Sequence, residues 1–218
     1  MKVTKLGHSC VLVETKAGRL LVDPGNLSIP QHQDLCEIDV ILYTHEHGDH
    51  WHKESLERLA AKNPAVQVVC NEGVGEHVRA VGLSYQCIDT GVEQAVAGFK
   101  LRAFASKHAE IYQEFGQVEH TGYLVDGRLF LAGDSFAVPP FAVEILAPAI
   151  VAPFCASKDV VEMVQQVKPR TVLTMHDGQL NEFGLNTWHT LLERLLADRE
   201  VEIVRFPVGT EWSGSETV

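Results

Sequence analysis

The segment Thr44–His50 (THEHGDH) constrains this chain more than any other feature, because it crowds three imidazoles and two carboxylates into seven residues. It directly follows the apolar run Val40–Tyr43, which is typical of a buried strand. In extended backbone, residues two apart point to the same side, so His45 and His47 can bind one ion together. Imidazole and carboxylate are ligands that suit zinc and related transition metals. A solvated polar loop is the alternative, but this density of ligand side chains at a strand end favours a metal site.

Carboxylate or imidazole side chains also stand at the ends of other apolar, strand-like runs. Leu20–Asp23 ends in an aspartate, and an isolated histidine or aspartate follows each of three later runs. These runs are Lys100–Ala105, Leu124–Leu131 and Thr171–Met175, and the residues that follow them are His108, Asp134 and His176. Because the ends of separate strands can meet at one edge of a sheet, we expect these side chains to converge with the first segment.

This ordered set, with its spacing His45-x-His47-x-Asp49-His50, resembles the metallo-β-lactamase superfamily. The resemblance implies an α/β fold, the four-layer αβ/βα sandwich, in which two facing mixed sheets carry helices on their outer sides. The metal site would lie at one edge of both sheets. The implied centre holds two ions: one bound by His45, His47 and His108, the other by Asp49, His50 and His176, with Asp134 bridging them.

The expected cofactors are therefore two divalent metal ions. Zinc is the first choice, and Mn²⁺, Fe²⁺ or Ni²⁺ would suit the same ligands. Water held between two such ions loses a proton readily, and Asp49 is expected to orient the resulting hydroxide and to pass on its proton. Asp23 is expected to support a ligand histidine by accepting its free N–H; a plain turn at Asp23-Pro24-Gly25 is compatible with this role. The pattern has histidine where the oxygen-reducing di-iron members carry glutamate, which favours hydrolysis over redox chemistry.

Two further histidines are candidate catalytic residues. His8 lies in Gly7-His8-Ser9, which resembles a motif of small bacterial members of the superfamily; a hydrogen-bonded turn histidine is the alternative. His120 begins a strand and could approach the metals from the loop after His108. The remaining histidines are expected in ordinary roles, His52 as a helix cap or surface residue and His32, His77 and His189 in solvent.

Apolar residues near the expected ligands are candidates for the wall of the site. Trp51 is expected either to shape the pocket or to pack at the sheet edge. The residues that follow Asp134 are expected to form an apolar wall or lid, with a stiffened loop as the alternative: Phe136, Pro139, Pro140 and Phe141.

Within the superfamily, the pattern looks most like the small bacterial metal-dependent hydrolases related to the ascorbate-phosphate lactonase group. Leu6–Ser9, Gly122–Gly127 and Met175–Gly178 carry this closer resemblance. It implies hydrolysis of an ester, lactone or phosphoester bond in a small-molecule substrate by a metal-activated hydroxide. The alternatives are a nuclease or phosphodiesterase of the same fold, and a non-catalytic metal-binding member. Degenerate ligands would indicate the last of these, and all seven expected ligand positions are intact.

Length and composition limit the remaining possibilities. A chain of 218 residues can form one core, so we expect a single domain over residues 1–218. The formal net charge is −11 and Lys and Arg are scattered, so we expect no nucleic-acid partner. Four prolines and a glutamate interrupt the longest apolar stretch, 136–155, so we expect no membrane association. Five cysteines without a CxxC pair, and an N-terminus unlike a signal peptide, favour the cytoplasm. A homo-oligomer is compatible with all of these properties.

Hydrophobic periodicity predicts a mixture of strands and helices throughout the chain. The expected helices are His52–Lys62, Glu72–Val81, Ser157–Lys168, capped by Ser157, and Thr187–Asp198. The expected strands are Lys2–Leu6, Cys10–Glu14, Arg19–Asp23, Val40–Thr44, Val66–Cys70, Gln86–Ile88, Ala95–Ala97, Lys100–Ala105, Tyr123–Val125, Arg128–Ala132, Ile145–Ala152, Thr171–Met175 and Glu202–Phe206. Asp126-Gly127 between two of these strands is a strong hairpin signal.

Overall fold

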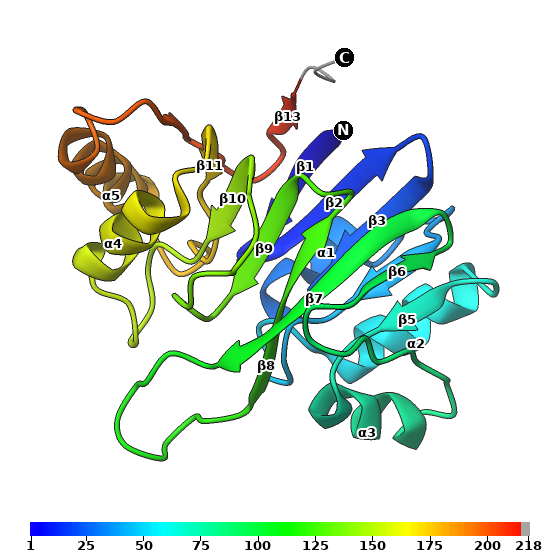
Figure 1. Ribbon diagram of the computed structural model, residues 1–218. Helices are drawn as coiled ribbons and strands as arrows, with labels where there is room; N and C mark the ends of the chain where they lie inside the picture. Colours follow the sequence, from blue (N-terminus) through cyan, green and yellow to red (C-terminus); the bar gives the residue numbers. More distant parts are fainter. Residues whose placement is uncertain (215–218) are drawn as a thin grey trace.

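Two mixed β-sheets face each other in the computed structural model, which describes residues 1–214 (Figure 1). The first sheet contains β1 (Lys2–Gly7), β2 (Cys10–Thr15), β3 (Gly18–Val22), β4 (Val40–Leu42), β5 (Gln67–Val69) and β13 (Glu211–Ser213). The second contains β6 (Glu93–Val96), β7 (Phe99–Lys107), β8 (Glu119–Val125), β9 (Leu129–Gly133), β10 (Ile145–Pro148), β11 (Thr171–Leu173) and β12 (Glu202–Val204). The strand orders are β13-β1-β2-β3-β4-β5 and β12-β11-β10-β9-β8-β7-β6.

The central strands are apolar on both faces because both faces are buried. Val11 and Val13 of β2 pack between the two sheets, whereas Leu12 belongs to the cluster on the outer side of the first sheet. The same alternation in β4 places Val40 and Leu42 between the sheets. Parallel pairing joins β3, β4 and β5 in the first sheet and β9 to β12 in the second.

Helices cover the outer face of each sheet (Figure 1). On the first sheet, α2 (Lys53–Lys62) and α3 (Glu72–Ala80) bury side chains such as Leu56 and Val74 against the outer face. On the second, α4 (Ser157–Val167) buries Met163, and α5 (Glu182–Leu195) packs beside α4. A 3₁₀ turn, η1 (Asn26–Ser28), and the short α1 (Ile29–His32) follow β3. The expected four-layer αβ/βα sandwich is therefore confirmed. Among residues 1–214, no helix has the length and apolar character needed to cross a membrane.

The structure corrects three of the expected elements. Residues 86–88 form no strand, and only Gln86 makes an isolated bridge to β5. Helix α5 begins at Glu182, well before the expected Thr187, because Asn181 caps it by accepting a hydrogen bond from the N–H of Gly184 at 2.9 Å. Ser157 is the first residue of α4 rather than its cap. The cap is Ala156, whose N–H donates to the Asp159 carboxylate.

Candidate metal centre

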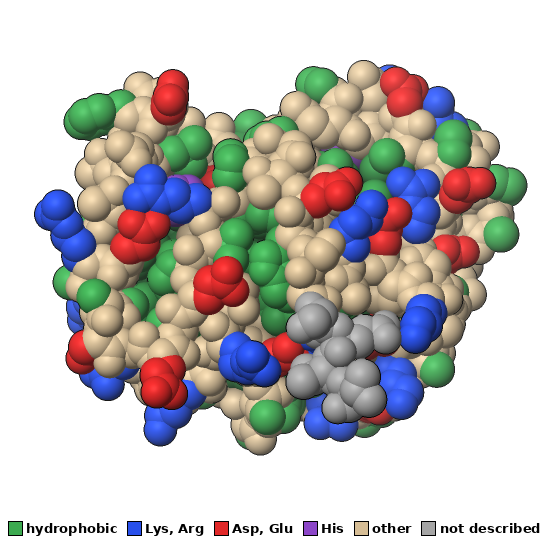
Figure 2. Space-filling model, turned by 90° about the horizontal axis from the view of Figure 1, so that it is seen from above, with side chains coloured by type: hydrophobic (Ala, Val, Ile, Leu, Met, Phe, Trp, Pro, Cys, Tyr) green, Lys and Arg blue, Asp and Glu red, His purple; other side chains and the backbone are tan. Residues whose placement is uncertain are grey.

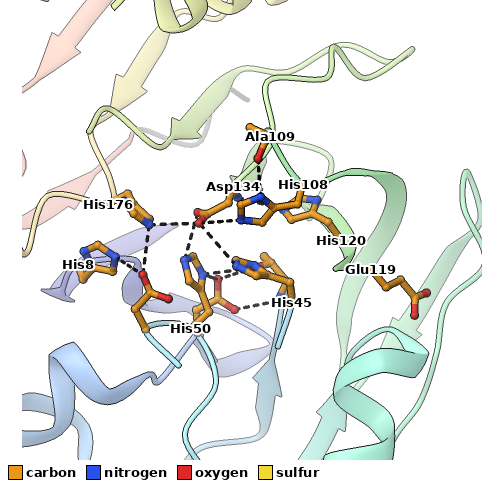
Figure 3. A network of polar contacts seen from close by, with 12 residues as sticks. His8, His45, His50, His108, Ala109, Glu119, His120, Asp134 and His176 are labelled. Carbon is orange, nitrogen blue, oxygen red and sulfur yellow. Dashed lines mark hydrogen bonds and ion pairs between the residues drawn. The ribbon is translucent and has the colours of Figure 1, made fainter. Parts of the chain in front are cut away.

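The expected ligands converge at one edge of the two sheets, because each follows the end of a strand (Figure 3). The first sheet contributes the loop after β4, with four of the residues. The second sheet contributes the loops after β7, β9 and β11, with one residue each. The convergence of the signature segment with His108, Asp134 and His176 is thus a property of the topology, since these residues lie far apart in the sequence.

Two groups of candidate ligand atoms lie side by side in this edge. Within each group, one ligand atom from every residue lies within 4.8 Å of the others. The first group is His45, His47, His108 and Asp134. The second group is His8, Asp49, His50 and His176.

Asp134 lies between the two groups and contacts both. Its Oδ2 is 3.4 Å from His108 Nε2 and 3.2 Å from His176 Nε2, and its Oδ1 is 3.1 Å from His50 Nε2. The side chain is buried, and burial alone would raise its pKa. The surrounding histidines outweigh burial and hold the pKa of Asp134 well below its usual range. Asp134 is therefore an anionic carboxylate whose Oδ2 contacts both groups and whose Oδ1 contacts the second.

The outward nitrogen of four histidines is fixed by a protein acceptor. Nδ1 of His50 donates to Asp23 Oδ2 at 2.8 Å, and Nδ1 of His176 donates to the carbonyl of Val151 at 2.7 Å. Nδ1 of His108 lies 2.7 Å from the Ala109 carbonyl. The remaining contact joins His45 Nδ1 to Thr44 Oγ1 at 3.0 Å, and because that hydroxyl donates its own proton to Asp23, it accepts from the imidazole. All four rings therefore carry a proton on Nδ1 and direct Nε2 to the centre, where each ring in its neutral form presents a lone pair.

These inward nitrogens have no hydrogen bond. Among the buried side-chain atoms of residues 1–214, the Nε2 atoms of His45, His50, His108 and His176 lack a hydrogen-bond partner, and so does Asp134 Oδ1. Buried polar atoms are nearly always satisfied, so a cluster of unsatisfied lone pairs calls for a Lewis acid. The residues present thus fit the binding of divalent metal.

The electrostatics of the centre also call for positive charge. Burial lowers the pKa of His45 well below its usual value. Burial also opposes protonation of His50 and His176, but Asp134 and the other nearby carboxylates outweigh it. They raise the pKa of His50 well above its usual value and that of His176 to about 9. The buried carboxylates therefore need a counter-charge, which protons or metal ions supply.

His8 belongs to the second group by distance, but its hydrogen bonds give it a different task. The N–H of Gly178 donates to His8 Nδ1 at 3.1 Å, so Nδ1 of the neutral ring carries no proton. The proton is then on Nε2, which lies 3.0 Å from Asp49 Oδ2 and donates to it. Burial lowers the pKa of His8, which favours the neutral ring. A nitrogen that carries a proton cannot bind a metal, so His8 orients Asp49.

His120 was expected to act at the reacting atoms, but both of its ring nitrogens form hydrogen bonds within the protein. Nε2 accepts a hydrogen bond from the backbone N–H of Asp134 at 3.0 Å, and Nδ1 lies 2.9 Å from Ser106 Oγ. Burial lowers its pKa to about 3, so the ring is neutral. Gly133 makes this contact possible, since a Cβ there would lie 2.4 Å from His120 Nε2. His120 therefore positions the backbone of Asp134 from behind.

A buried ion pair lies behind His176 and was not expected from the sequence. Lys5 Nζ, on β1, is 3.0 Å from Asp177 Oδ1 and donates to the carbonyl of Thr174 at 3.0 Å. The Lys5 side chain has no exposed surface. Because Lys5 belongs to the first sheet and Asp177 follows β11 of the second, the pair joins the two sheets directly behind the centre.

The apolar residues around the centre agree only in part with the wall that the sequence predicted. Trp51 is buried and packs edge-on against Tyr43, so of its two expected roles the structure shows packing at the sheet edge. Phe141 packs among the residues between the second sheet and its helices. Phe136 lies 6.3 Å, ring centre to ring centre, from Phe154, which the sequence analysis missed because no motif surrounds it. The ring of Phe154 lies 4.9 Å from that of His108.

The histidines outside the centre also yield corrections. His77 is half-exposed, as expected, and His52 is the N-cap residue of α2. The expectation that His32 and His189 lie in solvent is wrong, because both are buried. His32 contacts the carbonyl of Gly25, and His189 contacts Thr174 Oγ1 at 2.9 Å. Each is a buried histidine with one ring nitrogen in a hydrogen bond, and Nδ1 of His32 has no hydrogen-bond partner among the described residues.

The geometry agrees with a comparison to known families. A family model described as the β-lactamase superfamily domain matches residues 2–176. This chain belongs to that superfamily. The resemblance of its motifs to the metallo-β-lactamase superfamily is thereby confirmed.

Several relatives of this superfamily member cover almost the same length. The chain is 31% identical to Protein Rv0786c of Mycobacterium tuberculosis over 183 residues, which cover 82% of this chain and 84% of that protein. It is 27% identical to the UPF0173 metal-dependent hydrolase of Thermococcus onnurineus over 233 aligned positions, covering 95% and 97% of the two chains. The solved structure of Igni18, a novel metallo hydrolase from Ignicoccus hospitalis, matches with a TM-score of 0.74 at 17% identity, over 98% of this chain and 99% of that chain. This last similarity concerns the fold alone.

Proposed function

We propose that this protein is a metal-dependent hydrolase with a dinuclear centre, and that zinc is its metal. The observation that carries the proposal is the set of buried, unsatisfied Nε2 atoms arranged around the Asp134 carboxylate. His45, His47 and His108 would hold one ion and Asp49, His50 and His176 the other, with Asp134 placed to contribute to both. The relatives described as metal-dependent hydrolases support the same reaction class.

When bound, the two ions supply a hydroxide near neutral pH and polarise the bond under attack. The protein's own residues hold this arrangement in place. Asp49 is the carboxylate of the two groups that retains exposed surface, 24% of its side chain, so it faces the incoming substrate. His8 Nε2–H holds Asp49 Oδ2 in a fixed orientation. Asp49 orients the nucleophile and accepts its proton, and His120 fixes the backbone of Asp134.

We propose a small ester, lactone or phosphoester as substrate and residues 1–218 as one catalytic domain. The five cysteines are free, which suits a reducing compartment such as the cytoplasm. The nuclease alternative gains no support from the face drawn in Figure 2, where acidic and basic side chains are interspersed and no broad basic patch gathers.

Metal content tests the proposal directly. Protein purified without a histidine tag is expected to contain about two equivalents of zinc by elemental mass spectrometry. His47→Ala and Asp134→Ala should lose metal and hydrolytic activity toward esters and lactones yet keep the native circular dichroism spectrum, because these side chains serve a site rather than the core. His77→Ala is the matched control, since His77 is a half-exposed histidine outside both groups. Unchanged metal content in both variants would contradict the assignment, and intact metal without hydrolysis would favour a non-catalytic member.

A further inference from the structure

Phe154 lies against both halves of the candidate metal centre. It stands in the turn after β10, which an isolated bridge between Ala152 and Cys155 closes. Its ring centre is 4.9 Å from that of His108 and 5.5 Å from that of His176. Those histidines belong to different groups, so the half-buried aromatic ring lies beside one histidine of each group.

The position of this ring is coupled to the geometry of the centre. The carbonyl of Val151, in the same turn, accepts the Nδ1–H of His176 at 2.7 Å. Phe136, two residues after Asp134, lies against Phe154 and is itself packed into the apolar clusters beneath α4 and α5. The turn therefore holds the half-buried Phe154 ring beside the candidate metal centre.

The chemistry of these surroundings selects against a charged substituent. An aromatic ring binds apolar groups through its surface and offers no hydrogen bond or positive charge to an anion. A cavity of about 580 Å³ has His108 as the one residue of the centre in its lining, and Phe154 does not line it; its charged lining residues are Glu110, Glu114 and Glu119 against one cation, Lys107. A substrate phosphate or carboxylate extending into this region would meet net negative charge.

We propose that Phe154 is a specificity-determining residue that binds an uncharged apolar group attached to the scissile carbonyl. The substrate class is then an apolar carboxylic ester or lactone rather than a phosphorylated metabolite. In the reaction, a hydroxide oxygen adds to the carbonyl carbon, the bond to the leaving alcohol oxygen breaks, and the proton ends on that oxygen. This inference rests on the proposed hydrolase function and narrows its substrate.

Binding of carboxylates to the zinc-loaded protein tests the inference without turnover. Acetate, hexanoate and adipate share a carboxylate head, and calorimetric titration measures their affinities. Hexanoate should bind at least about tenfold more tightly than acetate, because burial of each methylene is favourable. Adipate, which carries a second carboxylate at the end of the same chain, should bind more weakly than hexanoate. Equal affinity for acetate and hexanoate, or tighter binding of adipate, would overturn the proposal.

Substitutions at Phe154 test whether the preference for hexanoate over acetate depends on this side chain. Phe154→Ala should reduce the preference for hexanoate over acetate to about twofold, whereas Phe154→Leu should keep most of it. Phe183→Ala is the matched control, because Phe183 is 80% exposed on α5, and it should retain the full preference. The ratio of kcat/KM for 4-nitrophenyl hexanoate and 4-nitrophenyl acetate should change in parallel. A preference that survives in Phe154→Ala would refute the role of this residue. Failure of the protein to take up zinc or to bind acetate would instead overturn the hydrolase function, and this inference with it.

Discussion

His8 lies within 4.8 Å of three candidate ligand atoms, yet its hydrogen bonds show that it serves Asp49. His8→Gln can keep an N–H donor near the position of Nε2, whereas His8→Asn can keep an acceptor for Gly178 but lies too short to reach Asp49. Both variants should retain the native zinc content. Loss of one charge-assisted hydrogen bond is worth about 1.5–3 kcal/mol, so kcat of His8→Asn should fall roughly tenfold or more.

In these His8 variants, kcat, KM and zinc content are measured together. His8→Gln should recover a large part of kcat with little change in KM, which a purely structural role would not produce. An equal loss of one zinc equivalent in both variants would show instead that His8 binds a metal.

The sequence indicated which side chains converge at this edge of the sheets better than it indicated their hydrogen bonds. His108, Asp134 and His176 could be predicted because a chemically suitable side chain follows an apolar run in each case. The task of His120 depends on β8 lying beside β9, which places its ring behind the backbone of Asp134. Phe154 has no pattern around it, and only the fold of its turn brings it to the centre.

At the scale of secondary-structure elements, Lys5 and Asp177 tie β1 to the loop after β11. Lys5→Met leaves a buried carboxylate without its partner and should lower the free energy of unfolding by about 3–5 kcal/mol, measured by urea denaturation. The double variant Lys5→Met/Asp177→Asn should recover part of this loss, because no unpaired charge remains.

Lys2→Met is the control for this ion pair, since Lys2 is also on β1 but forms its ion pairs with Glu14 and Glu211 at the surface. Its effect on stability should be small, because solvent screens exposed ion pairs. Equal destabilisation by the two Lys→Met substitutions would show that the buried pair has no special role. The sequence could not reveal this pair, because a lysine in a strand of alternating polarity is typical of an exposed position.

At the scale of the whole molecule, the positions of the strands could be predicted from the sequence, but the pairing of strands within each sheet could not. The short continuous apolar runs of β2, β3 and β4, which are buried on both faces, made these strands predictable from the sequence. The short β13 was missed, because it depends on antiparallel pairing with β1 from the opposite end of the chain. The facing of the two sheets followed only from the family resemblance, since periodicity describes each strand separately and carries no information on the order of strands.

The proposed metal pair would join these two sheets, because four of its ligands follow β4 of the first sheet and three follow strands of the second. Zinc should therefore stabilise the protein: a ligand at 100 times its Kd adds about 2.7 kcal/mol to the free energy of unfolding. Removal of metal with a chelator should lower Tm, and added zinc should restore it. The far-ultraviolet circular dichroism of the metal-free protein should remain native, because the apolar core between the sheets forms without the centre.

His47→Ala should show the low Tm with or without zinc, while His77→Ala should respond like the native protein. Two results would contradict this account, in which the core folds without metal and the metal centre links the two sheets. One is a Tm that zinc does not change, and the other is a loss of secondary structure when the chelator removes the metal.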